Sequence, residues 1–520
     1  FLKWQNNRRL SQVNRQVTAH ASIKPGQKPV VFFNATTRLV GVSQNAAFAF
    51  LAASAVQLAG VPVVHFACRS GLYRCVLGTN REDPQADPPC AACVAQSGWL
   101  FANAPTVWFD PGRDESLSCK LKDLGVEVMG ELVYQGIPLG ELVTPSLRWS
   151  LRRHHFNDDE PTRFLYREYI HASYRLIREF GAMLDQVDPA CVVVFNGIMY
   201  PEASARWAAR RRGLRVITHE VGMRPFSAFF TSGDATAYPI DIPASFDLLP
   251  EQNARLDQYL EQRFKGMFSM AGIRFWPEMA PLSQEFLARA AGFRQIVPVF
   301  TNVIFDTSQI HANMVFPHMF AWLDLVLEII RSHPETLFVI RAHPDELRPG
   351  KESRESVQDW VKSNRVQELP NVVFFNSNEY ISSYELIQRA KFVMVYNSSI
   401  GLEASLLGAA VLCGGKARFT QIPTVFFPET QEAYRQQAEA FLAGDSIDIP
   451  DDFRRNARRF LYYQLFRTSL PFDDFMEPHP MPGFVNLRPL YWQKLTPQAS
   501  PALRAILDGI LNGGSFLLEE

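Results

Sequence analysis

The chain has 520 residues, which is more than one hydrophobic core usually organises, so two or three domains are expected. It is 47% hydrophobic and 20% charged, a mixture that excludes disordered and fibrous proteins and indicates a globular one. The 52 basic residues almost balance the 53 acidic ones, which excludes the strongly basic surface of a protein that coats nucleic acid. An anionic ligand must therefore be held by individual residues at its site and not by a generally basic surface. No nucleic-acid partner is expected.

Residues 1–28 are predicted to form an N-terminal helical segment. The stretch from Phe1 to Val17 mixes basic side chains with Trp4 and Leu10. It has two interpretations, a helix packed on the protein surface, which we favour, or a helix lying on an anionic membrane as a peripheral anchor. The chain opens without Met and without a basic, apolar leader, so we expect a cytoplasmic protein rather than a secreted one.

The most apolar stretch runs from Asn45 to Cys68 and raises the question of a membrane span. Gly60 and Pro62 divide this stretch, and Gln57 lies inside it. These residues favour a buried helix over about 44–59 followed by a buried strand over 61–67, and not a spanning helix.

Short β-rich runs alternate with helix-length amphipathic runs, which is typical of parallel sheets covered on both faces. In the first half, helices are predicted near 44–59, 163–184 and 200–212, and strands at 30–33, 62–66, 106–109, 191–195 and 214–218. A zone without clear period, Arg224 to Pro250, follows and is interpreted as a linker.

The alternation then restarts, which predicts a second unit. Its strands are expected at 296–300, 337–341, 372–375, 392–396, 410–413 and 424–427, with helices near 316–332, 353–363, 380–389, 401–408 and 430–443. The fold class is therefore α/β, with two doubly wound Rossmann-like domains facing a cleft. The predicted division is a first domain at 29–285, with a cysteine-rich insertion at 68–93, a second domain at 290–465 and a C-terminal extension at 466–520.

Four of the seven cysteines, Cys68, Cys75, Cys90 and Cys93, fall within 26 residues. Their spacing is C-x6-C and then C-x2-C, and two thiolates two residues apart can bind one tetrahedral ion. A structural zinc site is one interpretation, and plain buried or surface thiols are the other. Disulfides are less favoured because nothing indicates an oxidising compartment.

Ligands of open parallel sheets collect beyond the carboxyl ends of the strands, so the residues after each strand are the candidates for binding. In the second half, Ser398 and Ser399 follow a strand and open a helix that contains Gly401 and Glu403. Hydroxyls and amides at such a helix start suit a phosphate, and Glu403 suits ribose hydroxyls. The alternative is an ordinary Ser helix cap with a first-turn Glu.

Three further strand ends in the second half carry polar residues. Arg341 and His343 end one strand in Arg-Ala-His-Pro, where His343 can donate to a phosphate and Arg341 adds positive potential. A second strand end carries Thr301 and Asn302, which could contact the same phosphates; the alternative is a turn stabilised by Asn and Asp side chains. The third carries Lys416, which could assist there; the alternative is that Lys416 and Arg418 are solvated loop cations.

In the first half, Glu220 follows a predicted strand in His-Glu-Val-Gly. A carboxylate facing the cleft suits a general base that takes a proton from an acceptor hydroxyl. Asn196 and Glu202 follow the neighbouring strand and are candidates to orient the acceptor or the base. The alternative for these two is a tight turn followed by a solvated Glu.

Taken in order, the acidic residue before glycine, Arg-x-His-Pro and Ser-Ser-x-Gly-x-Glu-Ala resemble bacterial GT-B glycosyltransferases of capsule and surface-polysaccharide assembly. The resemblance is nearest to Kdo transferases and bacterial sialyltransferases. It implies a nucleotide-sugar donor on the second domain and a saccharide or lipid-linked acceptor on the first, with CMP mildly preferred as the donor nucleotide. It also implies that His343, Ser398 and Ser399 hold the donor phosphate and that Glu220 activates the acceptor.

The acidic motif departs from the adjacent acidic pair of that family, so the base is less firmly indicated than the phosphate site. Catalysis without a metal cofactor is expected because no Asp-x-Asp motif stands at a strand end. Three alternatives to glycosyl transfer remain, a nucleotide-sugar 2-epimerase, a polyol-phosphate transferase, or a non-catalytic zinc-stapled scaffold of a polysaccharide-assembly complex.

Overall fold

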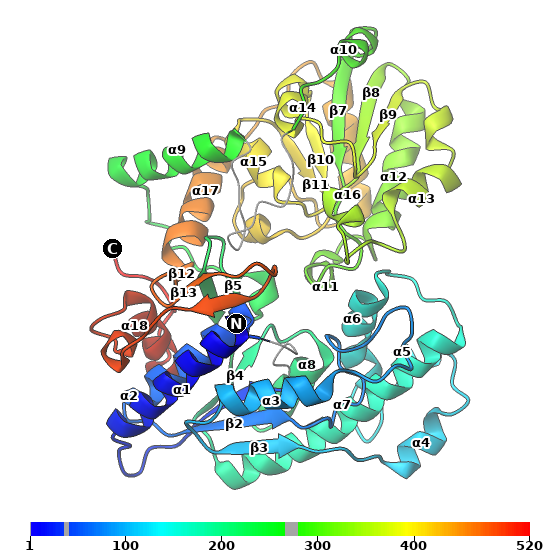
Figure 1. Cartoon of the computed structure of the whole chain (residues 1–520). Helices are drawn as coiled ribbons and strands as arrows, with labels where there is room; N and C mark the ends of the chain where they lie inside the picture. The colour runs from blue at the N-terminus through cyan, green and yellow to red at the C-terminus, as the bar shows by residue number, and fades with distance from the viewer. Residues whose placement is uncertain (1, 36–40, 266–278) are drawn as a thin grey trace.

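Two sheets, one parallel throughout and one mainly parallel, form the framework of the protein, and each belongs to one α/β unit (Figure 1). The computed structural model describes residues 2–35, 41–265 and 279–520. The predicted fold class, two doubly wound Rossmann-like units, is confirmed by the order and direction of the strands.

The first sheet has seven strands in the described chain, in the order β12-β6-β5-β4-β1-β2-β3. The strands from β3 to β5 are parallel, and β6 and β12 extend one edge in antiparallel pairing. The bounds are β1 Val30–Asn34, β2 Val63–Cys68, β3 Thr106–Phe109, β4 Cys191–Phe195, β5 Arg215–Val221, β6 Ser227–Thr231 and β12 Leu470–Pro471.

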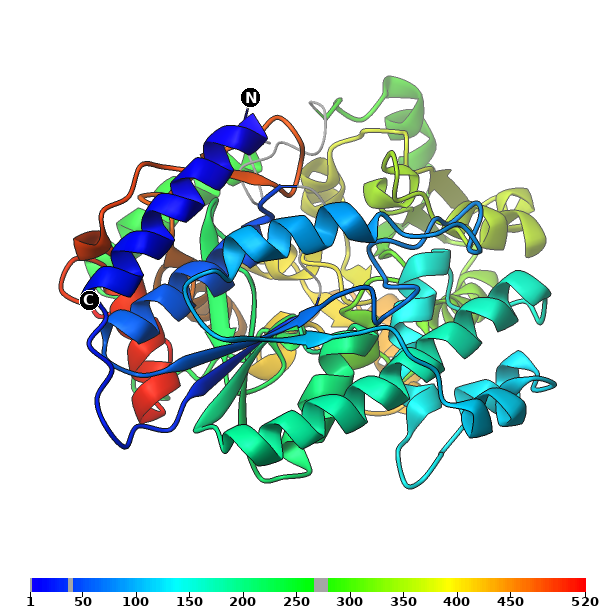
Figure 2. The ribbon, with the colours of Figure 1, turned by 60° about the horizontal axis from the view of Figure 1, so that its bottom comes forward.

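Helices cover both faces of this sheet (Figure 2). Alternate residues of a strand point to opposite faces, so Val30 and Phe32 join one buried cluster while Val31 and Phe33 join the other. The helices before β7 are α1 Leu2–His20, α2 Gln44–Leu58, α3 Cys90–Leu100, α4 Glu115–Leu121, α5 Val126–Gly130, α6 Leu139–Leu151, α7 Glu160–Val187, α8 Tyr200–Arg210, η1 Ala235–Ala237, α9 Pro250–Phe264 and α10 Gln284–Ala290.

The second sheet is parallel throughout, in the order β11-β10-β7-β8-β9. Its strands are β7 Gln295–Phe300, β8 Thr336–Arg341, β9 Val372–Phe375, β10 Val393–Val395 and β11 Val411–Cys413. Its helices are α11 Gln309–Ala312, α12 Met319–Ser332, η2 Pro344–Leu347, α13 Val357–Ser363, η3 Val366–Glu368, α14 Ser383–Arg389, α15 Ile400–Leu406, η4 Arg418–Gln421 and α16 Gln431–Ala443. The strand order reverses between β7 and β10, and that reversal opens a crevice at their carboxyl ends.

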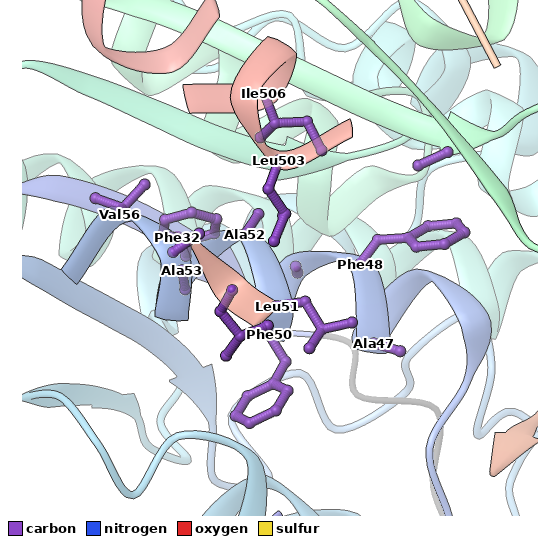
Figure 3. Packing of buried hydrophobic residues seen from close by; sticks show 14 of the residues in the cluster. Phe32, Ala47, Phe48, Phe50, Leu51, Ala52, Ala53, Val56, Leu503 and Ile506 are labelled. Carbon is purple, nitrogen blue, oxygen red and sulfur yellow. The ribbon is translucent and has the colours of Figure 1, made fainter. Parts of the chain in front are cut away.

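The end of the chain returns to the first unit, as the orange α17 and red α18 show in Figure 1. Leu503 and Ile506 of α18 are fully buried in one cluster with Phe32 and Leu51 (Figure 3). Residues 466–520 therefore complete the first unit. The elements are α17 Asp451–Tyr462, η5 Tyr463–Arg467, β13 Met476–Pro478, β14 Val485–Leu487, η6 Trp492–Leu495, α18 Pro501–Leu507 and η7 Asp508–Asn512.

Two predictions about elements are wrong. The zone 224–250 is no linker, because β6 pairs with β5 there and buries Phe229 and Phe230. The segment 424–427 forms only an isolated bridge between Phe426 and Leu412. Helix α10 lies at the predicted division and packs Phe286 against Leu337 and Val339 of β8.

The N-terminal helix α1 packs on the first unit. Leu10, Val13 and Val17 are buried in the same cluster as α2, which agrees with the favoured of its two interpretations. Nothing in 2–35, 41–265 or 279–520 forms a helix with the length and apolar character needed to cross a bilayer.

Two histidines of the first unit lie inside the protein. His65 and His219 are each 1% exposed, and burial lowers the pKa of each to about 3. His219 stacks on Phe230 with ring centroids 5.0 Å apart. Both side chains are therefore neutral core residues at neutral pH.

We predict that Leu503→Ala destabilises the first unit by about 2–5 kcal/mol, because the truncation leaves a cavity between α18 and α2. Val133→Ala is the control, since Val133 is 60% exposed and its truncation should change stability by less than about 0.5 kcal/mol. Denaturant unfolding measures both, and equal effects would contradict the assignment of residues 466–520 to this core.

We also predict that stability falls as the pH is lowered from 7 towards 4. The unfolded chain binds protons at these histidines near the ordinary His pKa of about 6.5, whereas the folded chain binds them only near 3. Thermal unfolding across this pH range measures the slope. His219→Gln should flatten it and His20→Gln, at an exposed position, should not; an unchanged slope in His219→Gln argues against a buried neutral histidine.

Candidate functional site in the cleft

A cavity of about 800 Å³ lies between the two units, at the carboxyl ends of β7, β8 and β10. This volume is within the usual range for small-molecule sites. The first unit contributes Trp149, Arg152, Met223, Thr236, Ala237 and Pro239 to its wall. The second unit contributes most of the remaining wall, including the residues that follow the three strands.

The predicted loops around His343 and Ser398 both line this cavity. They follow β8 and β10, which flank β7 on opposite sides, so the strand order brings together segments more than fifty residues apart. The roles of the two loops remain predictions, but their convergence is a property of the fold.

His343 begins the short helix η2, and its Nδ1 accepts a hydrogen bond from the Asp345 amide at 3.2 Å. Because Nδ1 is the acceptor, the ring proton is on Nε2. Burial lowers the pKa of His343, and nearby Asp345 and Asp306 only partly oppose this effect. The ring is therefore neutral at neutral pH and can donate a hydrogen bond without carrying a charge.

The two strand ends at the reversal point are tied together by asparagines. Asn302 Nδ2 donates to Asn397 Oδ1 at 2.7 Å, and Asn302 Oδ1 accepts from the Val303 amide at 2.8 Å. Thr301 Oγ1 donates to the Arg341 carbonyl at 3.0 Å and so joins β7 to β8. Thr301 and Asn302 line the cavity, but these bonds already engage their side chains, so they shape the site more than they offer free donors.

The start of α15 offers fewer donors than the sequence suggested. The amides of Gly401, Leu402 and Glu403 already donate to the carbonyls of Ser398 or Ser399. Ser398 is nearly buried and Ser399 is exposed, and both line the cavity.

Gly401 is not among the residues that line the cavity, and its binding role stays a prediction. A Cβ at this position would come within 2.9 Å of Phe419 and 3.0 Å of Val395. The absence of a side chain here allows α15 to pack closely against the strand β10 and Phe419.

Glu403 lines the cavity but is already held by two partners. Its carboxylate pairs with Arg263 from α9 and accepts a hydrogen bond from the Tyr384 hydroxyl. Burial would lower the pKa of Arg263, but the Glu403 carboxylate outweighs burial and raises it. A carboxylate has about four acceptor positions, so Glu403 retains capacity for a sugar hydroxyl.

Positive charge predominates in the wall of the cavity. Burial, together with the neighbouring cations Arg206, Lys416 and Arg418, lowers the pKa of His311 to about 4. Burial lowers the pKa of Arg341 only to about 10, so that guanidinium stays charged at neutral pH. Among described residues, the basic wall residues are Arg152, Arg263, Arg341, Arg348, Lys351, Lys416 and Arg418, against Asp306, Asp345 and Glu403.

Arg152 is a candidate that sequence reasoning missed. It is 1% exposed, and none of its three guanidinium nitrogens has a hydrogen-bond partner among the described residues. The guanidinium lies over the rings of Trp149, at 4.1 Å, and Phe305, at 4.9 Å. A buried cation without a paired acid suits an anionic ligand. No sequence motif marks Arg152, because Phe305 approaches it from the other unit.

Glu220, the predicted base, lies at the end of β5 but does not line the cavity. Asn196 Nδ2 donates to Glu220 Oε2 at 2.9 Å, and Asn45 Nδ2 donates to Oε1 at 3.4 Å. Asn196 therefore orients Glu220, as one interpretation proposed. Glu202 is 1% exposed on α8, so the interpretation of a solvated Glu is wrong, and it also lies outside the cavity wall.

His154, His155 and His318 meet where the units touch, with ligand-type atoms within 4.8 Å of one another. His155 Nδ1 lies 2.5 Å from Glu355 Oε1, and His318 Nδ1 accepts from the Ala321 amide at 3.1 Å. That second bond places the proton of His318 on Nε2, where a metal needs a lone pair. The cluster therefore fits a contact between the units better than a metal site.

Residues 286–436 match the model of a family described as capsule polysaccharide biosynthesis protein. The matched segment contains β7 to β11 and every cavity residue that the sequence predicted in the second unit. The predicted resemblance to proteins of capsule and surface-polysaccharide assembly is confirmed by this match. The second unit is thus similar to this family over the strands that line the cavity.

The chain is also 28% identical to Protein FixF of Sinorhizobium fredii over 301 residues, which are 56% of this chain and 62% of that protein. It therefore spans less than two thirds of the length of this relative.

Among solved structures, a β-Kdo 2,4-transferase, KpsC of Thermosulfurimonas dismutans, aligns with a TM-score of 0.35 and 12% identity, covering 59% of this chain and 87% of that one. The UDP-GlcNAc 2-epimerase of Neisseria meningitidis aligns with a TM-score of 0.26 and 12% identity, covering 84% and 98%.

We predict that Arg263→Met destabilises the protein by about 3–5 kcal/mol, because it leaves the buried Glu403 carboxylate without its cation. The double variant Arg263→Met/Glu403→Gln should lose less than the single one. Lys265→Met is the matched control, since the pair of Lys265 and Glu261 on the same helix is about 60% exposed and should contribute at most about 1 kcal/mol. Chemical denaturation measures all three, and a double variant that loses as much stability as Arg263→Met, or more, would contradict the pairing.

Proposed function

We propose that the protein is a glycosyltransferase that moves a sugar from a nucleotide-sugar donor to a saccharide or lipid-linked acceptor in surface-polysaccharide biosynthesis. One observation carries the proposal. The cavity between the units is built from the strand ends at the reversal of the second sheet, and its wall carries an excess of basic residues. Anionic donors with a diphosphate or monophosphate suit such a site.

The donor phosphate is proposed to lie among His343, Ser398, Ser399 and Lys416. When the glycosidic bond to the nucleotide breaks, negative charge develops on the leaving phosphate. His343, a neutral ring with its proton on Nε2, donates a hydrogen bond to that oxygen, and Lys416 offsets the charge. Glu403 accepts from the ribose hydroxyls while Arg263 and Tyr384 fix its orientation. We propose that these groups provide the charge stabilisation without a metal cofactor.

The acceptor is proposed to bind on the side of the first unit. Glu220, held by Asn196 and Asn45, is the proposed base that takes the proton of the acceptor hydroxyl. Because Glu220 stands outside the cavity wall, this role requires the acceptor to reach from the cavity towards the end of β5. Arg152 is proposed to bind an anionic group of the donor sugar or the acceptor.

We predict that a nucleotide stabilises the protein and that His343 is needed for this effect. A ligand at 100 times its dissociation constant stabilises by about 2.7 kcal/mol, so a thermal-shift screen of CMP, UDP, GDP, ADP and CDP identifies the base. His343→Ala should weaken the shift and abolish turnover. His479→Ala is the matched control, because His479 Nδ1 also accepts from the amide two residues later but lies on the β13–β14 hairpin.

Glu220→Gln should abolish turnover and leave the nucleotide shift intact. Product analysis with and without added acceptor separates the alternatives, since a 2-epimerase consumes no acceptor. Full activity of both His343→Ala and Glu220→Gln would refute the assignment of roles, and a nucleotide shift without any turnover favours the scaffold.

A further inference from the structure

Arg152 ends the helix α6 at a place where the first unit meets the second (Figure 1). Its carbonyl accepts a hydrogen bond from the Arg354 amide of the second unit at 2.9 Å. Its backbone is left-handed, with φ 58° and ψ 37°. Helices commonly end with such a residue, but it is usually glycine or asparagine, because a Cβ is strained in this conformation. The needs of the helix therefore do not explain an arginine at this position.

The surroundings of the Arg152 guanidinium hold aromatic rings and a second cation, but no acid bound to it. The rings are those of Trp149 and Phe305, and none of the three guanidinium nitrogens has a hydrogen-bond partner among the residues that the structure describes. Burial, together with the charge of Arg81, lowers the pKa of Arg152 to about 9, and Glu352 opposes this effect only in part. The side chain is therefore a buried cation at neutral pH whose charge is not balanced by a hydrogen-bonded acid.

The chemistry of a guanidinium indicates which anion fits this position. Its N–H groups lie in one plane, and two of them match the two oxygens of a carboxylate. One guanidinium also offsets the single charge of a carboxylate, whereas a phosphate monoester carries about −1.5 to −2 at neutral pH. A carboxylate therefore balances the charge of Arg152 better than a phosphate does.

Arg152 lines the cavity from the first unit, whereas His343, Ser398 and Lys416 line it from the second. A ligand group at Arg152 is thus on the side where the acceptor is proposed to bind. Trp149 comes from the first unit and Phe305 from the second, so a small movement between the units would open the edge of the guanidinium to the cavity.

We propose that Arg152 binds the carboxylate of an acidic sugar in the acceptor and thereby selects acidic acceptors over neutral ones. The proposal rests on the proposed transferase function, because it names the acceptor of that reaction. The binding itself can be measured without turnover, so the two can fail separately.

Three methyl glucosides that differ only at C6 test the site in the full chain. They are the methyl glucuronide, its uncharged amide of nearly the same shape, and the 6-phosphate. We expect the wild-type protein to bind the glucuronide at least about tenfold more tightly than the amide, because hydrogen bonds between charged groups are lost in the amide. Calorimetric or NMR titration measures the three affinities.

Arg152→Met should bind the glucuronide and the amide equally. This variant should also keep the melting temperature of the wild-type protein, because it removes a buried charge that no acid balances. Arg148→Met is the matched control and should keep the preference for the glucuronide. Arg148 stands one turn earlier on α6, donates to the His154 carbonyl at 3.2 Å and is not among the residues that line the cavity.

Equal binding of the glucuronide and the amide by the wild-type protein would overturn the proposal without any variant. Tighter binding of the 6-phosphate than of the glucuronide, or an unchanged preference in Arg152→Met, would also overturn it. So would loss of the nucleotide thermal shift in Arg152→Met, because the guanidinium would then serve the donor phosphate. A preference for the glucuronide in a protein with neither nucleotide shift nor turnover would support this site and contradict the proposed function.

Discussion

The site depends on the reversal of strand order in the second sheet. The chain leaves β7 and β10 towards opposite faces of the sheet. A crevice therefore opens between the carboxyl ends of these two strands. The hydrogen bond between Asn302 and Asn397 holds the two ends together at 2.7 Å. The loops after β8 and β10 then converge, and His343 and Ser398 reach one cavity because the sheet places them there.

Some charged side chains in the wall of the cavity are paired with an opposite charge, and others are not. Glu403 is paired with the cation Arg263, so the two side chains together add no net charge to the cavity. Arg152, in contrast, is buried against aromatic rings without a hydrogen-bond partner among described residues. Burying an unpartnered guanidinium costs free energy, which a bound anion would offset. This free-energy cost is the physical reason for the proposal that Arg152 binds an anionic group.

The first unit is completed by distant parts of the chain, and two of its loops contact the second unit. The C-terminal helix α18 buries Leu503 against α2. Arg81 and Glu82 contact the second unit at Gly350 and Arg354, respectively. Glu355 of the second unit accepts the amides of His154 and His155 at 2.8 and 3.0 Å. Residues 81–82 and 154–155 of the first unit thus join it to the second unit.

The sequence by itself determined the two parallel sheets and the strand-end motifs, because alternating apolar runs and the polar residues after them are local patterns. His343, Ser398 and Glu403 were found in this way. Tertiary structure alone decided that residues 466–520 complete the first core, that Gly401 serves packing, and that Arg152 faces Phe305 from the other unit. These contacts join residues distant in the chain, and no local period encodes which distant surface a side chain will meet.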